Sequence, residues 1–289
     1  MSGQDNVADD AMQTRLRAIA TEFGAGPPIC HLLGGMGHSY RVTSSQGYRV
    51  IKPAPHPEES QWLGETFAQL PETEAVRIPT AVIGSSGTWI FDDHVCWTWL
   101  DGGGEEGRYA EKLAASRAFH QAAFVLRKPN YIDCRDDPWA LADRVAWGER
   151  PADYDAETMR VLGPVLSEIG RTPLPPGTEE QLIHGDLSGN FVFAPGLAPG
   201  IIDITPYWRP VGFAEAVMWI DSIWFDAPAD LRIFDRPGMR AFALRALARR
   251  MAEQPEQVAA GQKSRDSAAM MLARLNGEAG RLIGAFSSG

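Results

Sequence analysis

Strand-like and helix-like segments lie in separate parts of this sequence, and this separation limits the folds that the chain can adopt. Runs of β-branched and aromatic residues predict strands before residue 100 and in one later hairpin, the early ones at 29–33, 40–43, 48–52, 81–83, 89–91 and 95–100. Helical spacing of apolar residues predicts helices at 11–23, 57–70, 108–126, 137–148, 156–169, 214–225, 238–253 and 265–282. Strands and helices segregated in this way predict an α+β fold.

A glycine-rich segment at 101–107 separates the two parts. We therefore expect two lobes. Residues 1–100 form a small lobe built on an antiparallel sheet, and residues 101–289 form a larger, mostly helical lobe. Ligand sites favour the cleft between such lobes.

Composition narrows the class of partner. The formal net charge of −10 disfavours a general nucleic-acid binder, because phosphate contacts need a basic surface. The three cysteines show no zinc or disulfide pattern, which favours a reducing compartment. No signal-peptide pattern and no bilayer-length apolar run is visible. We expect a cytoplasmic protein with no nucleic-acid or membrane partner, and composition leaves the oligomeric state open.

The segment HGDLSGN at 184–190 carries the densest group of chemically useful side chains. Phe191-Val192-Phe193 reads as a strand, 194–200 as a turn and Ile201-Ile202 as the returning strand. In an antiparallel pair the residue before the first strand lies beside the residue after the second, so Asn190 and Asp203 are predicted to meet.

Asp186, Asn190 and Asp203 together supply two carboxylates and an amide. Such a group can hold magnesium on a nucleotide, with a nearby Asp aligning an acceptor hydroxyl. The alternative is ordinary turn chemistry, since Asp and Asn beside a strand are most often turn residues. The order of other features along the chain favours phosphoryl transfer.

The loop before the strand at 40–43 contains Gly34, Gly35, Gly37 and Ser39. Glycine lets backbone N–H groups approach phosphate oxygens without a Cβ in the way. A tight structural loop between strands is the alternative. No Gly-Lys-Ser/Thr follows, so the loop does not match the Walker pattern.

Lys52 ends the strand at 48–52 and so follows the glycine loop by one hairpin, where a kinase-like fold keeps the lysine that pairs with phosphates. A solvated lysine at a strand end is the alternative. A phosphate-pairing lysine needs an acidic partner from the next helix, and the nearby choices are Glu58, Glu59, Glu65 and Glu72. Glu59 lies at the centre of the apolar face formed by Trp62, Leu63, Phe67 and Leu70, whereas Glu58 and Glu65 lie off it. We therefore predict that Glu59 holds Lys52.

Trp97 and Trp99 lie where the last early strand runs into the glycine-rich segment. A purine can stack on such side chains while the backbone reads its edge. A buried strand with two core tryptophans is an equally good interpretation, and the two do not exclude each other.

In chain order these features are a glycine loop, a strand lysine, a helix glutamate, a linker, His-Gly-Asp with Asn190, and Ile201-Ile202-Asp203. This order resembles the aminoglycoside phosphotransferase-like branch of the protein-kinase-like fold, over roughly residues 29–225. HGDLSGN and the segment Asp203 to Pro210, with its Pro-Tyr-Trp-Arg-Pro, look most like uncharacterised actinobacterial phosphotransferase-like proteins.

The resemblance implies a bilobal protein-kinase-like fold and a small-molecule kinase. Such a kinase would transfer the γ-phosphoryl group of ATP or GTP to a hydroxyl of a small metabolite or antibiotic-like acceptor. Asp186 would orient that hydroxyl, Asn190 and Asp203 would bind Mg2+, Lys52 would bind the α/β-phosphates, and His184 would be structural. No Ala-Pro-Glu follows Asp203, which disfavours a protein kinase.

Two departures from the family pattern define an alternative. Three residues separate Asp186 from Asn190 where the family commonly has four, and Ile204-Thr205 follows Asp203 where an aromatic or acidic residue is usual. The shortened loop favours a catalytically weak pseudokinase that binds nucleotide as a regulatory or scaffold protein.

The sequence does not identify the acceptor. Several aspartates in the helical part are candidate contacts for an amine or a sugar, and each is also explained as a helix cap, turn residue or surface charge: Asp133, Asp136, Asp137, Asp221 and Asp226. Arg209 could contact a phosphate or a carboxylate, or pair with a neighbouring acid.

Overall fold

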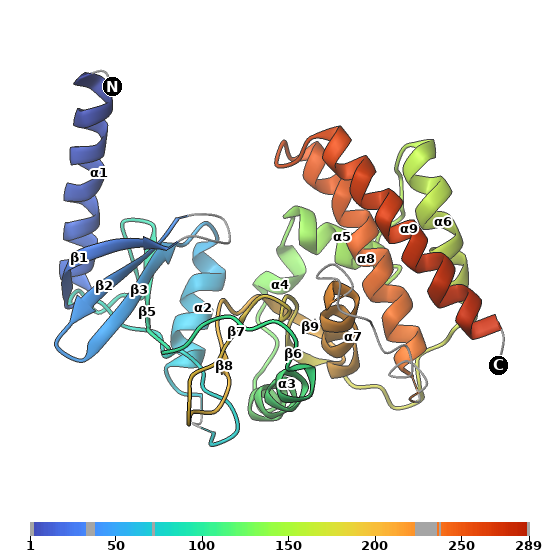
Figure 1. Ribbon diagram of the computed structural model, residues 1–289, viewed down its shortest axis with the longest axis horizontal. Helices are drawn as coiled ribbons and strands as arrows, with labels where there is room; N and C mark the ends of the chain where they lie inside the picture. The colour runs from blue at the N-terminus through green and yellow to red at the C-terminus, as the bar shows by residue number, and fades with distance from the viewer. Residues whose placement is uncertain (1–2, 33–37, 71–72, 223–235, 237, 288–289) are drawn as a thin grey trace. The chain divides into compact units, whose positions relative to one another are not determined.

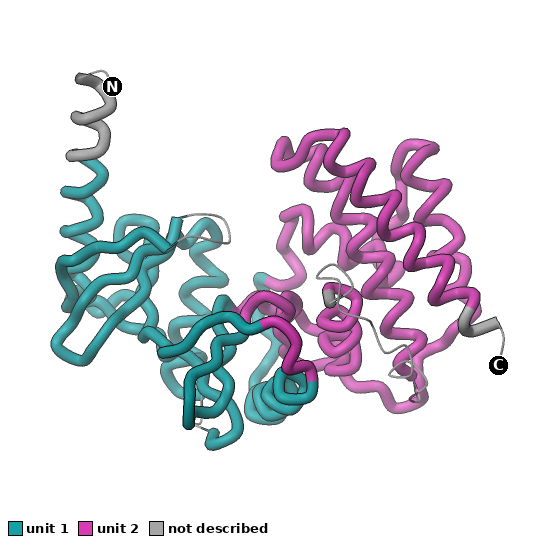
Figure 2. Tube along the Cα trace, in the orientation of Figure 1, with its two compact units in different colours: residues 1–105, 110–131, 191–203 teal, residues 106–109, 132–190, 204–289 magenta. Residues whose placement is uncertain are grey.

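The chain forms two units, each assembled from separate stretches of sequence (Figure 2). Unit 1 comprises residues 1–105, 110–131 and 191–203, and unit 2 comprises residues 106–109, 132–190 and 204–289. The computed structural model describes residues 3–32, 38–70, 73–222, 236 and 238–287. Each unit is described by itself below.

Unit 1 contains the predicted antiparallel sheet (Figure 1). Its strands occur in the order β1-β2-β3-β5-β4, with neighbours antiparallel throughout. Ser44 and Gly47 close the β2–β3 hairpin where the sequence predicts a turn. The strand bounds are β1 (Ala25–Leu32), β2 (Ser39–Ser44), β3 (Gly47–Pro53), β4 (Ile90–Phe91) and β5 (His94–Thr98).

The C-terminal part of helix α1 (Gly3–Glu22) packs against one face of this sheet. Apolar residues of these last turns, and Phe23 just after them, form one cluster with residues of β2, β3 and β5: Leu16, Ile19, Ala20, Phe23, Val42, Ile51 and Cys96. Because side chains alternate along a strand, Lys52 and Trp97 project from the opposite face. The helix begins at Gly3 rather than near residue 11, and no Gly or Pro interrupts it from residue 4 to residue 22.

The other elements of unit 1 form where the sequence predicted them, with one exception. Helices α2 (Pro57–Phe67) and α3 (Tyr109–Ala123) form as expected, and so does the hairpin of β7 (Phe191–Val192) and β8 (Gly200–Ile201). The strand predicted at 81–83 is only a single bridge between Ala81 and Trp97. Beyond this bridge the same edge of β5 is occupied by β4, because Ile90 pairs with Val95 and Phe91 with His94.

Unit 2 is built around helix α8 (Met239–Ala259), which contacts α5, α6, α7 and α9. Figure 1 shows α8 and α9 as long neighbouring helices. The prediction ended this helix at residue 253, but the helix continues through Pro255. The other helices are α4 (Tyr131–Cys134), α5 (Pro138–Ala146), α6 (Ala156–Arg171), α7 (Val211–Ser222) and α9 (Arg265–Ser287). Within the ranges given above, no helix has the length and apolar character needed to cross a membrane.

Two short strands of unit 2 were not predicted. β6 (Gln181–His184) pairs antiparallel with β9 (Pro206–Arg209), and both strands are largely buried. Each is four residues long, too short for a clear alternating pattern, and β9 begins with a proline. This pair matters for function because β6 leads directly into the segment 184–190.

The N-terminus of α6 offers a test of local stability. Asp155 caps this helix by accepting N–H bonds from Glu157 and Thr158, both at 3.0 Å. The bonds from Thr158 and Glu157 hold the pKa of Asp155 below its ordinary value. The cap therefore stabilises the fold above the ordinary carboxyl pKa, and its contribution disappears as pH falls through the lowered pKa.

We expect Asp155→Ala to lower the free energy of unfolding by about 1 kcal/mol at neutral pH. Asp155→Asn is the matched control, because Asn caps a helix about as well without titrating. Urea unfolding at neutral and acidic pH measures both variants. The stability advantage of the wild type over the Ala variant should shrink in acid, whereas the advantage of the Asn variant over the Ala variant should stay constant. A wild-type advantage that is undiminished in acid contradicts the role of the cap.

Candidate active site

Strand β6 anchors the His-Gly-Asp segment through a buried histidine. His184 is fully buried, and its Nδ1 accepts the backbone N–H groups of Asp186 at 3.2 Å and Thr205 at 3.4 Å. The Gly185 N–H also donates to the Thr205 carbonyl at 2.9 Å. Because Nδ1 accepts, the proton of the neutral ring lies on Nε2. This geometry agrees with the structural role expected for His184.

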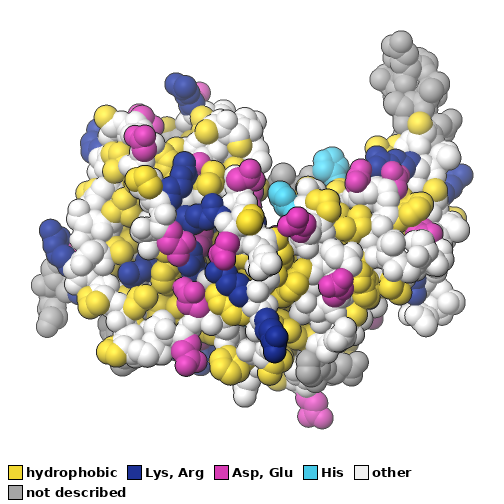
Figure 3. Space-filling view, turned by 180° about the vertical axis from the view of Figure 1, so that it is seen from behind, with side chains coloured by type: hydrophobic (Ala, Val, Ile, Leu, Met, Phe, Trp, Pro, Cys, Tyr) yellow, Lys and Arg dark blue, Asp and Glu magenta, His cyan; other side chains and the backbone are white. Residues whose placement is uncertain are grey.

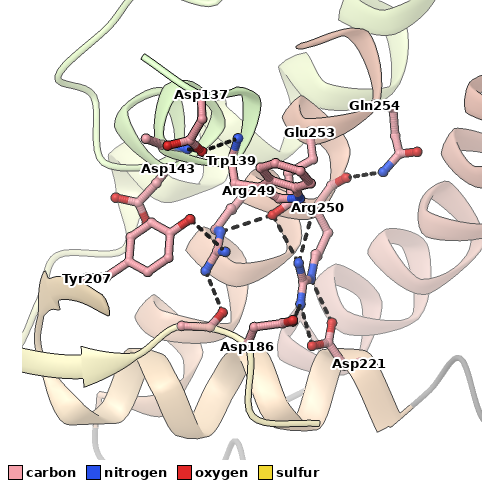
Figure 4. A network of polar contacts seen from close by, with 12 residues as sticks. Asp137, Trp139, Asp143, Asp186, Tyr207, Asp221, Arg249, Arg250, Glu253 and Gln254 are labelled. Carbon is pink, nitrogen blue, oxygen red and sulfur yellow. Dashed lines mark hydrogen bonds and ion pairs between the residues drawn. The ribbon is translucent and has the colours of Figure 1, made fainter. Parts of the chain in front are cut away.

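Asp186 presents a carboxylate that is fixed on one side and open on the other. Half of its side-chain surface is exposed (50%), while its Oδ1 accepts a hydrogen bond from Arg250 at 3.0 Å. Arg250 is buried and also contacts Asp221 and Glu253 (Figure 4). The sequence predicted Asp186 but not this contact.

The turn after Asp186 fixes Asn190. The Asn190 backbone N–H donates to the Leu187 carbonyl at 3.0 Å, and its side-chain Nδ2 donates to the Asp186 carbonyl at 2.6 Å. An acceptor carbonyl requires the nitrogen of the amide on that side, so Oδ1 is the atom that Asn190 could offer to a cation. The metal role of Asn190 stays a prediction.

In unit 1, Lys52 and Asp203 form an ion pair across a long stretch of sequence. Lys52 Nζ lies 2.5 Å from Asp203 Oδ1. The Asp203 side chain is 59% exposed and the Lys52 side chain is 27% exposed, so the pair is open to solvent. Asp203 adopts a left-handed backbone conformation, with φ of 51°. Such strained positions cluster at ligand-binding and catalytic sites.

Asn190 and Asp203 flank the β7–β8 hairpin along the chain. Phe191 pairs with Ile201, so Asn190 directly precedes the ladder and Asp203 lies two residues beyond its last pair. The two residues belong to different units, and their meeting stays a prediction.

Glu59 lies on the apolar face of α2, as the sequence indicated. Glu59 is half-buried, and Leu63 and Phe67 are buried one and two turns further along. Glu58 and Glu65 are exposed. The contact between Glu59 and Lys52 stays a prediction. Glu72 lies outside the described residues.

The two tryptophans of the expected nucleotide site differ in their surroundings. Trp97 is 7% exposed and packs edge-on against Phe67. This supports the core interpretation for its side chain. Trp99 is half-buried, its Nε1 donates to Asp101 Oδ1 at 3.1 Å, and Arg41 lies over its ring at 5.4 Å.

The glycine loop cannot be compared with its prediction, because Gly34, Gly35 and Gly37 lie outside the described residues. Ser39 is the first residue of β2 and pairs with Leu32 of β1. The phosphate-binding role of these four residues stays a prediction.

Several candidate acceptor contacts have structural partners in unit 2. Asp137 caps α5 by accepting the N–H groups of Trp139 and Ala140. Arg209 is buried and donates to Asp143 at 2.8 Å and to Glu149 at 2.7 Å. Of the interpretations that the sequence left open for Arg209, the structure thus shows pairing with neighbouring acids. Asp226 lies outside the described residues.

No protein-family model and no curated protein matches the sequence. Solved structures do match it in fold. Amicoumacin kinase hAmiN, solved with AMP-PNP and Ca2+, gives a TM-score of 0.64 at 15% identity, over 96% of this chain and 95% of that chain. A microcompartment-associated aminopropanol kinase gives 0.60 at 15% identity, over 95% and 98%.

Choline kinase LicA from Streptococcus pneumoniae gives a TM-score of 0.57 at 10% identity, over 95% of this chain and 98% of that chain. Spectinomycin phosphotransferase APH(9)-Ia is also similar. At these identities the likeness shows the fold, and it extends over nearly the whole of each chain. The chain therefore has the kinase-like fold of aminoglycoside phosphotransferases and small-molecule kinases.

Proposed function

We propose that this protein is a small-molecule kinase that transfers the γ-phosphoryl group of ATP or GTP to a hydroxyl of a small acceptor. The observation that carries the proposal is the Lys52–Asp203 ion pair in a kinase-like fold. It joins a strand lysine to an exposed carboxylate in a strained backbone conformation. A phosphoryl-transfer site needs both a cation for phosphate and a carboxylate for magnesium.

Each proposed role follows from the atoms available. Lys52 binds the α/β-phosphates, and Glu59 orients Lys52. Asp186, whose side chain is half exposed, aligns the acceptor hydroxyl through the carboxylate oxygen that Arg250 does not bind. Positioning and charge stabilisation supply most of the catalysis in such reactions. Gly34, Gly35, Gly37 and Ser39 contact the phosphates, and Trp97 and Trp99 contribute to the purine site.

Asn190 and Asp203 each offer an oxygen of the kind that magnesium binds, and we assign the metal to these two residues. Mg2+ is commonly held by one or two protein oxygens together with phosphates and water. Asp203 offers an exposed carboxylate and Asn190 an amide oxygen. In the part of the chain that is described, no three His, Cys, Asp or Glu side chains gather as a closed metal cage would need. When bound, Mg2+ neutralises charge on the phosphates.

The acceptor is a small hydroxyl compound. The similar structures are named as kinases of amicoumacin, aminopropanol, choline and spectinomycin, which supports this class without selecting a member. On the face drawn in Figure 3, acidic and basic side chains are interspersed. A nucleic-acid interface instead gathers Lys and Arg on one face.

A pseudokinase is the second candidate. The short Asp186 to Asn190 spacing favours it. A pseudokinase binds nucleotide but transfers no phosphoryl group.

Lys52→Met tests the nucleotide site. A charge-assisted hydrogen bond contributes about 1.5–3 kcal/mol, so we expect the affinity for Mg·ATP to fall roughly ten- to a hundredfold. Lys128→Met is the control, because Lys128 is exposed beyond α3. Calorimetric titration of each variant with the non-hydrolysable analogue AMP-PNP measures the change. Equal affinities for the Lys52 variant and the wild type would remove Lys52 from the site.

A further inference from the structure

Arg250 contacts three carboxylates of unit 2 at once (Figure 4). Its Nε and one terminal nitrogen bind the two oxygens of Asp221 at 2.7 and 2.5 Å. The other terminal nitrogen binds both oxygens of Glu253 at 3.0 Å. The first terminal nitrogen also reaches Asp186 Oδ1 at 3.0 Å. The planar guanidinium is thus fixed on both edges before it meets Asp186.

The anchors of this arginine are buried and the residue that it holds is not. Arg250, Asp221 and Glu253 are all buried, whereas half of the Asp186 side chain is exposed. Burial disfavours the charged guanidinium, but the carboxylates of Asp221 and Glu253 outweigh it and raise the pKa of Arg250 well above its ordinary value. Arg250 therefore stays charged, and the buried carboxylates of Asp221 and Glu253 fix the position of its guanidinium.

The neighbouring arginine holds the backbone of the same loop. Arg249 donates to the Gly185 carbonyl at 2.9 Å and to the Tyr207 hydroxyl at 3.2 Å. Its guanidinium carbon lies 4.3 Å from the centre of the Tyr207 ring. Consecutive residues of α8 thus fix the main chain before Asp186 and the side chain of Asp186.

We infer that Arg250 is a positioning residue for phosphoryl transfer. It holds Oδ1 of Asp186 so that the other carboxylate oxygen faces the acceptor hydroxyl in one orientation. Asp221 and Glu253 act through Arg250 by fixing its guanidinium. Arg250 exchanges no proton and touches no substrate. This inference rests on the proposed function, in which Asp186 aligns the acceptor.

The test needs a variant that leaves no uncompensated buried charge. Removing Arg250 alone would strand Asp221, and breaking a buried pair in this way is strongly destabilising. The double variant Arg250→Gln/Asp221→Asn removes one positive and one negative charge together. Glu253 keeps a cation in that variant, because its Oε1 lies 3.0 Å from Nε of Arg249. Arg250→Lys, which keeps the charge but loses the planar fork, is the second variant.

Arg245→Gln is the matched control on the same helix. Arg245 is half-buried, donates to the Ala241 carbonyl at 2.9 Å and lies over the Trp147 ring, away from Asp186. ADP release is followed with Mg·ATP and a mixture of choline, spectinomycin, hygromycin B and aminopropanol. The turnover number, the KM for ATP and the Tm are compared across the set.

We expect the double variant to lose roughly a hundredfold in kcat, the scale of a misplacement of about 1 Å, with the KM for ATP and the Tm near the wild-type values. Arg250→Lys should fall between, and Arg245→Gln should match the wild type. An unchanged kcat in both Arg250 variants overturns the inference while leaving the proposed function intact. A raised kcat also overturns it and shows that Arg250 masks Asp186. If the wild type binds Mg·ATP but releases no ADP with these compounds or with a mixed extract of small metabolites and hydroxylated antibiotics, the proposed function is overturned and this inference with it.

Discussion

Asp186→Asn should lower the turnover of a hydroxyl acceptor by roughly a hundred- to ten-thousandfold. The amide keeps the shape of the carboxylate but cannot accept the proton of the acceptor hydroxyl or bear its charge. Half of the Asp186 side chain is exposed, and the amide oxygen can still accept the hydrogen bond of Arg250. We therefore expect the fold and the affinity for Mg·ATP to change little. Steady-state ADP release and AMP-PNP titration measure the two properties.

Asp155→Asn is the matched control for this substitution, because it makes the same chemical change at a helix cap. It should turn over at the wild-type rate. Unchanged turnover in Asp186→Asn would remove Asp186 from the reaction. A loss of nucleotide affinity equal to the loss of turnover would instead make Asp186 a nucleotide ligand.

Gly185→Ala should produce the largest loss of stability of any single methyl group added to the loop at 184–190. A Cβ at Gly185 would lie 2.2 Å from Cδ2 and 2.6 Å from Cε2 of Tyr207. The Tyr207 ring is buried, and the guanidinium groups of Arg249 and Arg135 pack over it at 4.3 and 4.8 Å from its centre. Because the ring cannot move aside freely, we expect a cost of about 1–3 kcal/mol or more.

Gly189→Ala is the control in the same loop, since a Cβ there meets no atom within 4 Å. Urea unfolding followed by tryptophan fluorescence gives the midpoint of each variant. A lower midpoint for Gly185→Ala and a wild-type midpoint for Gly189→Ala support the packing described. Equal midpoints for the two variants contradict it.

Local sequence patterns predict much of the fold. The hairpin of β2 and β3 and the helix α2 could be predicted because alternation, turn residues and an N-terminal proline act within a few residues. The pair of β6 and β9 could not, because each strand is short and its stability comes from burial in unit 2. Helix α8 continues through Pro255, where its tertiary contacts outweigh the local cost of a proline.

The residues of the candidate site likewise divide into those that local motifs predict and those that only long-range contacts identify. Asp186, Asn190 and Asp203 are grouped by motif, so the sequence indicates them without a structure. The contact of Lys52 with Asp203 spans 151 residues and that of Arg250 with Asp186 spans 64, and no local rule predicts either. A signal for Arg250 was available. Arg249 and Arg250 are two cations within a run of alanine, leucine and methionine, and buried cations require acidic partners.

The central claim is that this protein moves a phosphoryl group to a small hydroxyl compound, and one measurement tests it most directly. The protein is incubated with Mg2+, ATP labelled with 18O in the γ-phosphoryl group, and a mixed extract of small metabolites and hydroxylated antibiotics. Mass spectrometry then follows the label. We predict a product that carries the labelled phosphoryl group and is absent with Asp186→Asn. If the wild-type protein binds Mg·ATP under these conditions and no acceptor gains the label, the protein is a nucleotide-binding pseudokinase and the kinase assignment is wrong.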